Sequence, residues 1–289
     1  MKIKKYIIQS KPYEGCTADF ENADIVLFGA GFDGTSSYRP GSRFAPNVIR
    51  NEAYYFQEDY SPYFQEDLKN KKIHDLGDVE IIFGNKEKSL DRIETITQFI
   101  LQNDKIPVCI GGEHLISYPI VKAVYKMHPD LHIIHLDAHL DAMDELLGEK
   151  FSHGTVIRRI YDLIQKPNHI YQVGIRSGSW EEFQFAETHT RLFLFNTFDF
   201  INSIDELSNK PIYLTLDVDV FDPSLLPGTG TPEAGGIFFQ EYIELLRKIK
   251  QLNIVGADIV ELSPYIDPAN VSAIVASKIL RELLIILGM

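Results

Sequence analysis

The chain has 289 residues, with 28 Lys and Arg against 41 Asp and Glu, so its formal net charge is −13. Its 45% hydrophobic and 24% charged residues are ordinary globular usage, which excludes a disordered, collagen-like or coiled-coil protein. An acidic chain has no net positive charge to displace counterions from phosphates, so we expect no nucleic-acid partner. The length suits one large α/β domain with a sizeable core.

The cysteines and the N-terminal segment indicate the compartment. Cys109 lies in the apolar run 106–110 and Cys16 in a polar stretch, so the sequence predicts free thiols and a reducing environment. The first residues carry only a short apolar run and no site for signal-peptide cleavage. No stretch approaches the roughly 20 apolar residues of a membrane span. We therefore expect a cytoplasmic protein with no membrane partner.

Short apolar runs alternate with amphipathic segments along the chain. This alternation favours right-handed strand–helix–strand crossovers and a three-layer α/β/α fold with a mostly parallel central sheet. The apolar runs predict strands at 25–29, 106–110, 132–136, 169–173, 192–195, 212–216 and 254–260. The amphipathic segments predict helices at 46–56, 88–103, 118–127, 155–165, 239–250 and 271–287.

The domain organisation follows from what the sequence lacks. No repeat, low-complexity linker or abrupt change in composition divides the chain, so we expect a single domain over residues 1–289, with 1–24 as an N-terminal extension. The Gly-, Pro- and Ser-rich stretch 29–46 is long for a loop in such a fold. Long loops of this kind are commonly functional, so we expect it to lie beside the substrate.

Polar side chains directly follow four of the predicted strands. In an open α/β sheet ligands bind beyond the carboxyl ends of the strands, and residues two apart in an extended segment point the same way. We therefore expect these side chains to converge on one place. They are His114 after 106–110; Asp137, His139 and Asp141 after 132–136; Asp217 and Asp219 after 212–216; and Glu261 after 254–260.

The carboxylates of this set would repel one another unless a cation lay between them, because no Lys or Arg lies within these short runs. Four Asp and two His without Cys form an oxygen-rich ligand set, which favours Mn²⁺ over a structural zinc. Six ligands are more than one ion needs once bound water is counted, so we expect two ions that share carboxylates and activate a water for hydrolysis. The alternative is that these side chains only cap loops.

Two further residues could act on a substrate. The Glu261 carboxylate could hold a planar guanidinium through paired N–H···O bonds. Alternatively, Glu261 is a surface residue or supports a ligand. His153 follows the D-x-H-x-D strand end in a short loop, too far along to complete that triplet. Because histidine titrates near neutrality, it could donate a proton to a departing amine; otherwise it is an exposed loop histidine.

The motifs taken together resemble the ureohydrolase family, which includes arginase, agmatinase and relatives. They occur in the family's order from about residue 25 to the C-terminus, which is far more specific than any single motif. Leu140 departs from the Thr common in the family, without removing a ligand. The matching segments are GGEH at 111–114, DAHLD at 137–141, SHGT at 152–155, DVDVFDP at 217–223, PGTGTPEAGG at 227–236 and DIVE at 258–261.

The resemblance implies two Mn²⁺ ions bridged by Asp137 and Asp217, and a bridging hydroxide that attacks the guanidinium carbon to give urea and an amine. It implies that Glu261 orients the guanidinium, that His153 shuttles the proton, and that Thr231 helps to position the substrate. Asp141 is expected to be catalytic as well as metal-binding. The implied ligands are His114, Asp137, Asp141 and Asp217 for one ion, and Asp137, His139, Asp217 and Asp219 for the other.

Within the family the sequence looks like the agmatinases, which split agmatine into urea and putrescine for polyamine biosynthesis. The segments 32–44 and 227–230 resemble agmatinase loops, and the acidic stretch 142–149 lacks the contacts with which arginases hold a substrate carboxylate. The resemblance also implies a homo-oligomer, a trimer or hexamer. Open alternatives are another guanidine (guanidinobutyrate, arginine, guanidine or formiminoglutamate), a single-zinc deacetylase and a non-catalytic relative.

Overall fold

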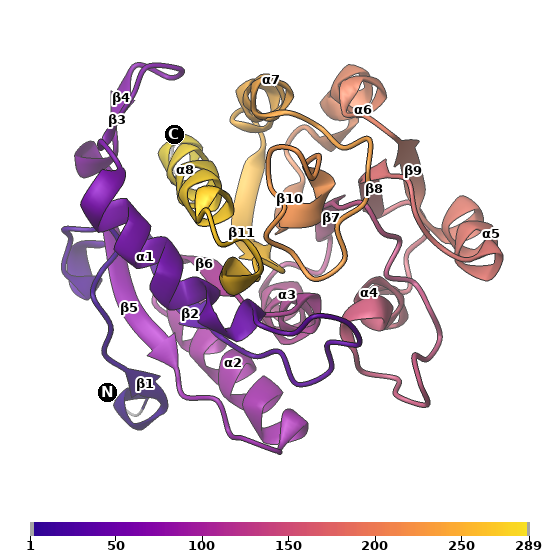
Figure 1. The fold of residues 1–289 in the computed structure, drawn as a ribbon, viewed down its shortest axis with the longest axis horizontal. Helices are drawn as coiled ribbons and strands as arrows, with labels where there is room; N and C mark the ends of the chain where they lie inside the picture. Colours follow the sequence, from indigo (N-terminus) through magenta and orange to yellow (C-terminus); the bar gives the residue numbers. More distant parts are fainter. Residues whose placement is uncertain (1–2, 288–289) are drawn as a thin grey trace.

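A mostly parallel sheet runs through the middle of the molecule (Figure 1). The computed structural model describes residues 3–287, and within them the sheet has nine strands. These are β1 (Ile7–Ile8), β2 (Ile25–Ala30), β5 (Ile73–Val79), β6 (Ile106–Gly111), β7 (His132–Leu136), β8 (Ile170–Ile175), β9 (Arg191–Leu194), β10 (Pro211–Asp217) and β11 (Asn253–Val260). Strands β3 (Tyr60–Ser61) and β4 (Glu66–Asp67) form a separate antiparallel hairpin.

The strand order is β1-β5-β2-β6-β11-β10-β7-β8-β9. Among the strand pairs of this sheet in residues 3–287, only β1 and β5 run antiparallel. The four strands whose ends carry the polar side chains, β6, β11, β10 and β7, are therefore consecutive neighbours. Their carboxyl ends lie at one edge of the sheet, which is where open α/β sheets bind ligands.

Helices cover both faces of the sheet and confirm the predicted three-layer α/β/α fold (Figure 1). Side chains of β2 alternate between two cores. Ile25 and Leu27 belong to the core under the helices at 45–56, 239–249 and 271–286, whereas Val26 and Phe28 belong to the core under the helices at 86–101, 117–127 and 156–164. In the described chain no helix is both long and apolar enough to cross a membrane. The helices are α1 (Ala45–Phe56), α2 (Lys86–Leu101), α3 (Ser117–Met127), α4 (Val156–Ile164), α5 (Trp180–His189), α6 (Phe198–Ser203), α7 (Phe239–Ile249) and α8 (Val271–Ile286).

The seven predicted strands and six predicted helices are all present, with ends within two residues of those expected. The sequence reading missed β5, whose residues His74, Asp75 and Asp78 break the apolar pattern. It also missed α5, which begins at a capping box between Ser179 and Glu182 and has few buried apolar residues, and the short α6. The ends of the expected single domain, residues 1–2 and 288–289, lie outside the described residues.

The aspartates Asp75 and Asp78 of β5 are paired with one buried arginine on α1. The Arg50 side chain is 1% exposed; its Nε lies 2.8 Å from Asp75 Oδ2, and its Nη1 lies 2.5 Å from Asp78 Oδ1. Opposite charges therefore compensate one another in the core, which is how a charged strand can pair inside the sheet.

Replacing this arginine tests that pairing. We expect Arg50→Met to lower the free energy of unfolding by about 3–5 kcal/mol, because two carboxylates would be left uncompensated in the interior. The control is Arg247→Met, which removes an exposed ion pair with Glu244 and should cost at most about 1 kcal/mol. Urea denaturation of both variants measures the difference. Equal stabilities would show that Arg50 does not hold β5 in the sheet.

Candidate metal centre

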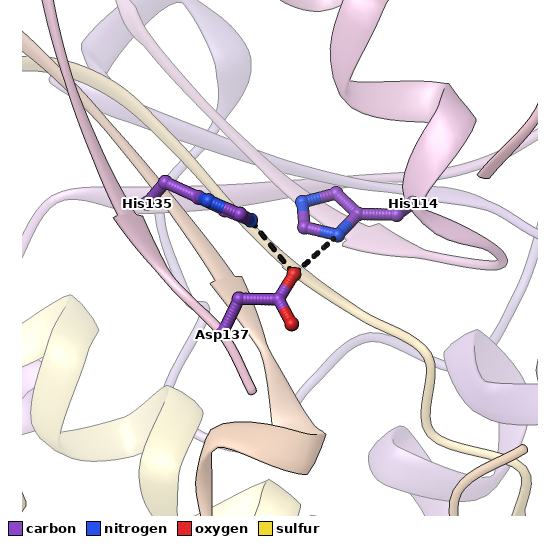
Figure 2. Close-up of side chains that lie close together, drawn as sticks. All are labelled: His114, His135 and Asp137. Atoms are coloured by element: carbon purple, nitrogen blue, oxygen red, sulfur yellow. Dashed lines mark hydrogen bonds and ion pairs between the residues drawn. The ribbon is translucent and has the colours of Figure 1, made fainter. Parts of the chain in front are cut away.

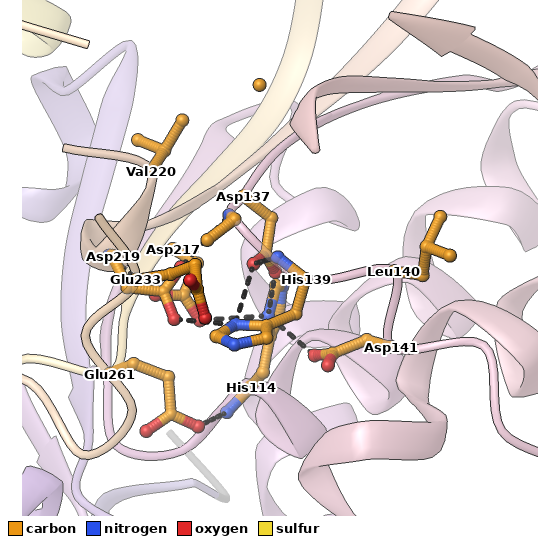
Figure 3. Close-up of polar contacts among 12 residues, drawn as sticks. His114, Asp137, His139, Leu140, Asp141, Asp217, Asp219, Val220, Glu233 and Glu261 are labelled. Carbon is orange, nitrogen blue, oxygen red and sulfur yellow. Dashed lines mark hydrogen bonds and ion pairs between the residues drawn. The ribbon is translucent and has the colours of Figure 1, made fainter. Parts of the chain in front are cut away.

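The structure brings the six predicted metal ligands together at the carboxyl edge of the sheet (Figure 3). His114 begins a short 3₁₀ turn after β6, and Asp217 is the last residue of β10. Asp137, His139 and Asp141 follow the end of β7 at alternate positions, and their side chains reach the same place. The ligand atoms belong to His114, Asp137, His139, Asp141, Asp217 and Asp219. These side chains are at most 11% exposed, apart from that of His139.

One ring nitrogen of His114 lies among three carboxylates. Its Nδ1 is 3.1 Å from Asp137 Oδ2, 3.2 Å from Asp141 Oδ2 and 3.3 Å from Asp217 Oδ2. None of these contacts has hydrogen-bond geometry, and within residues 3–287 this buried nitrogen has no hydrogen-bond partner. A buried polar atom without a partner requires an explanation, and a cation between the nitrogen and the three oxygens supplies one.

A second group of ligand atoms adjoins the first. His139 Nδ1 lies 2.8 Å from Asp219 Oδ2 and 3.6 Å from Asp137 Oδ1. Asp137 therefore contributes one oxygen to each group, which is the arrangement of a carboxylate that bridges two ions. The His139 side chain is 24% exposed, so this side of the centre is the more open to solvent.

The electrostatics of the bare centre are in conflict. Burial raises the pKa of Asp217, and the neighbouring Asp219 and Asp137 raise it further. Burial lowers the pKa of His114, but the carboxylates around it outweigh burial and raise that pKa well above its usual value. Without a cation, the Asp217 carboxylate therefore resists ionisation and the His114 imidazole resists deprotonation. Both groups must lose a proton to bind a metal, and divalent ions would supply the positive charge that favours this loss. The residues therefore fit a two-ion centre.

A buried hydrogen-bonded chain sets the orientation of His114. Its Nε2 lies 2.9 Å from Thr215 Oγ1, and the Thr215 hydroxyl donates to Asp258 Oδ1 at 2.6 Å. The Tyr213 hydroxyl donates to the other Asp258 oxygen. Because the Thr215 proton goes to Asp258, His114 Nε2 must donate, which leaves Nδ1 as the lone-pair nitrogen that faces the carboxylates.

Breaking this chain should weaken metal binding. We expect Thr215→Val to lower the metal affinity by about 10–100-fold, because His114 loses the acceptor that fixes its tautomer and ring orientation. Thr215→Ser keeps the hydroxyl and is the matched control. Isothermal titration of the metal-free proteins with Mn²⁺ measures both. Wild-type affinity in Thr215→Val would show that the hydroxyl does not support the ligand.

His135 also contacts Asp137, and the sequence reading did not single it out (Figure 2). Its Nε2 lies 2.7 Å from Asp137 Oδ2, which makes it a candidate ligand by distance alone. However, the Gln172 amide nitrogen lies 3.3 Å from His135 Nδ1, and the Thr190 hydroxyl donates to the Gln172 oxygen. The His135 proton therefore belongs on Nε2, so His135 supports Asp137 by donating to it. Its place two residues before Asp137 was the available signal.

Two of the expected catalytic residues have a left-handed backbone. Asp141 has φ 49° and Glu261 has φ 66°. Asp tolerates this left-handed region, whereas Glu seldom adopts it, so the backbone is strained at Glu261. Such backbone strain costs of order 1–3 kcal/mol and is common at functional sites. Glu261 N donates to Gly112 O, and Glu261 Oε1 accepts from His114 N at 2.8 Å. The main chain thus holds this carboxylate beside the ligand set.

A cavity of about 300 Å³ opens beside the ligands. The cavity adjoins the metal centre, because four of the expected ligands line it: His139, Asp141, Asp217 and Asp219. The residues expected to act on the substrate line it as well: Glu261, His153 and Thr231. Burial raises the pKa of Glu261, and the neighbouring Glu113 raises it further, so this carboxylate gains from a cationic partner.

A second group of possible ligands lies away from this centre. Asp130, His132 and His169 meet at the amino-terminal ends of β7 and β8. Lys210 pairs with the carboxylate at 2.9 Å, and the two imidazole rings are stacked with their centroids 3.9 Å apart. Stacked rings cannot both direct an in-plane lone pair at one ion, so this group is unsuited to a metal.

Comparison with known proteins identifies the family. The model of the arginase family matches residues 23–286. An agmatinase of Bacillus cereus is 44% identical over 285 residues, which cover 97% of this chain and 96% of the relative. A crystal structure assigned as an agmatinase of Clostridium difficile superposes with a TM-score of 0.91 at 47% identity, covering 93% of this chain and 99% of that one. An agmatine ureohydrolase of Thermoplasma volcanium superposes with a TM-score of 0.85 at 34% identity, covering 97% and 95%. The chain therefore belongs to the arginase family, the ureohydrolases.

Proposed function

We propose that this protein hydrolyses agmatine to urea and putrescine at the two-ion centre. The observation that carries the proposal is the charge of the cavity wall. Within residues 3–287 five carboxylates and no Lys or Arg line the cavity. Asp141, Asp217 and Asp219 belong to the ion-binding set, so Glu182 and Glu261 are the two carboxylates left to face a cationic substrate. Agmatine is a dication without a carboxylate, whereas the carboxylate of arginine or guanidinobutyrate would find no cationic partner here. The similarity to agmatinases supports the same substrate.

The shape of the wall also suits this substrate. Leu140, Met143 and Leu146 line the same cavity as the carboxylates. They offer apolar surface to the four methylene groups of agmatine, while Glu261 lies beside the ligand set and Glu182 offers a further negative charge in the same cavity. A guanidinium beside Glu261 and an ammonium beside Glu182 would each meet a carboxylate.

The ion-binding residues fall into two sets that share Asp137 and Asp217. We assign His114, Asp137, Asp141 and Asp217 to one ion, and Asp137, His139, Asp217 and Asp219 to the other. The preponderance of carboxylate oxygen favours manganese among the divalent ions. When bound, two such ions lower the pKa of a shared water molecule toward neutrality, which supplies the nucleophile for hydrolysis.

The remaining steps belong to the side chains around the cavity. Glu261 binds two guanidinium N–H groups and so presents the guanidinium carbon to the centre, helped by Thr231. Water adds to that carbon, and the bond to the chain nitrogen breaks. His153 gives the departing nitrogen a proton, so that this nitrogen leaves as the amine of putrescine. The guanidinium carbon, with the oxygen from water, leaves as urea. Asp141 acts as an ion ligand, which is the catalytic role that we assign to it.

Product analysis tests the proposal. Protein stripped with a chelator and reloaded with Mn²⁺ is incubated with agmatine, and urea and putrescine are quantified by mass spectrometry. We expect equal amounts of both, only after reloading. Activity of equal size in the stripped protein would contradict the two-ion centre. Ammonia together with a ureido amine would show that the other C–N bonds are cleaved and would contradict the reaction.

Three finer assignments belong to the same proposal: a homo-oligomer, a cytoplasmic location and a place in polyamine biosynthesis. Exposed aromatic side chains at the end of α1, Tyr54, Tyr55 and Phe56, favour association with another copy. Cys16 and Cys109 are both free, which favours a reducing compartment. Light scattering during size-exclusion chromatography tests the first, with a trimer or hexamer expected and a monomer contradicting it.

A further inference from the structure

We propose that Thr35 is a positioning residue that aims His153 at the substrate. This inference rests on the proposed function, in which His153 donates the proton. Thr35 belongs to the loop 31–44 between β2 and α1, which lies within the stretch 29–46 that the sequence predicts to lie beside the substrate. The loop connects a buried carboxylate, Glu113, on one side with His153 on the other.

Glu113 anchors the loop to the floor of the site. The Glu113 side chain is fully buried, and Thr35 donates to both of its oxygens: the backbone N–H to Oε2 at 2.7 Å and the hydroxyl to Oε1. The base of the loop is fixed as well, because Glu113 N donates to Phe32 O at 2.7 Å. A Cβ atom on Gly112 would lie 2.0 Å from that Phe32 oxygen, so the main chains pack too closely there for any other residue.

The anchored loop holds His153 at two points. His153 N donates to Thr35 Oγ1 at 3.2 Å, so the Thr35 hydroxyl is used both as a donor to Glu113 and as an acceptor from His153. Two residues along, Ser37 Oγ lies 3.1 Å from His153 Nε2. In the described chain the buried Nδ1 of His153 has no hydrogen-bond partner, so the loop makes the only hydrogen bond to the ring.

The consequence concerns proton transfer rather than binding. Ser37 and His153 line the same cavity, so the contact places the ring at the cavity wall. A general acid must lie within hydrogen-bond reach of the departing nitrogen, and a misplacement of about 1 Å can cost about 10²-fold in rate. Loosening Thr35 should therefore lower kcat and leave KM nearly unchanged, because substrate is held by Glu261 and the carboxylate wall.

The test compares Thr35→Val, Thr35→Ser and Ser37→Ala with wild type. The valine has the same shape without the hydroxyl, and we expect kcat to fall by about 10–100-fold with KM within about 3-fold. Serine restores the hydroxyl and should restore kcat. Ser37→Ala removes an exposed side chain, so we expect it to leave the fold intact and to give a smaller loss of kcat. The matched control is Thr95→Val, which removes an exposed hydroxyl on α2 and should behave as wild type.

A second readout does not depend on turnover. Diethylpyrocarbonate acylates accessible imidazoles, and mass spectrometry of the peptides gives the acylation rate of His153 relative to His128 in the same sample. We expect Thr35→Val to raise this relative rate severalfold and Thr35→Ser to leave it as in wild type.

The outcomes separate this inference from the proposed function. If wild type does not release urea from agmatine and Thr35→Val still raises the acylation rate, the proposed function fails and the positioning of His153 stands. If Thr35→Val matches wild type in both kcat and acylation rate, the inference is wrong. The inference is also wrong if Thr35→Val raises KM and leaves kcat unchanged, because the loss would then be one of substrate binding. It is wrong as well if Thr35→Ser does not restore kcat.

Discussion

Asp137→Asn is expected to lose bound metal and activity together. Asp137 gives one oxygen to the group around His114 and the other to the group around His139, and an amide cannot bridge two ions with its charge. We expect the metal content of the purified protein to fall and turnover of agmatine to fall by at least roughly 10³-fold, which is about 4 kcal/mol of transition-state stabilisation. Metal analysis and urea release, measured on the same sample, test both expectations.

The matched control for this variant is Asp130→Asn. Asp130 is half-exposed at the opposite end of β7 and pairs with Lys210 and Lys166, so the same change of charge should leave both metal and turnover unchanged. An Asp137→Asn protein that is fully metallated and active would remove Asp137 from the ligand set.

Glu261→Gln is expected to keep the metal and lose turnover. The amide oxygen of glutamine can still accept from His114 N, so the ligand set stays in place, but the charge that pairs with a guanidinium is gone. We expect kcat/KM for agmatine to fall by about 10²-fold, or about 2.7 kcal/mol, with metal content as in wild type. Steady-state kinetics and metal analysis measure the two effects separately.

Glu206→Gln provides the comparison for this second variant. Glu206 is an exposed residue that pairs with Arg191, and we expect the Glu206→Gln protein to have wild-type kinetics. Wild-type kcat/KM in Glu261→Gln would show that another group binds the guanidinium. Loss of metal from Glu261→Gln would show instead that Glu261 supports the ligand set and that its effect on turnover is indirect.

The convergence of the candidate side chains could be predicted from the sequence, whereas the contacts that support them could not. His114, the D-x-H-x-D run and the D-x-D run could be found because each directly follows an apolar strand, and parallel strands place such residues at one edge. The supporting contacts join residues far apart in sequence: Thr215 meets His114 across 101 residues. Whether a buried Thr meets a His depends on strand order and register, which local patterns do not encode.

The same reason explains the missed elements of the fold. Strand β5 contains Asp75 and Asp78, and a charged segment predicts a loop unless its partner is known. That partner, Arg50, lies 25 residues away from Asp75 on another element. The length and composition of the stretch 29–46 predict a functional loop, but the anchor of that loop, Glu113, is 78 residues from Thr35, so only the folded chain shows the contact.

The most direct test of the central claim is urea release by the manganese-loaded protein from agmatine, arginine, guanidinobutyrate and guanidine at equal concentrations. The carboxylate wall predicts a clear preference for agmatine, because each of the others either carries a carboxylate or lacks the second cationic end. A preference for arginine or guanidinobutyrate would contradict the assignment of the cavity wall and leave the two-ion chemistry intact. No urea from any of the four, with metal shown to be bound, would contradict guanidine hydrolysis itself.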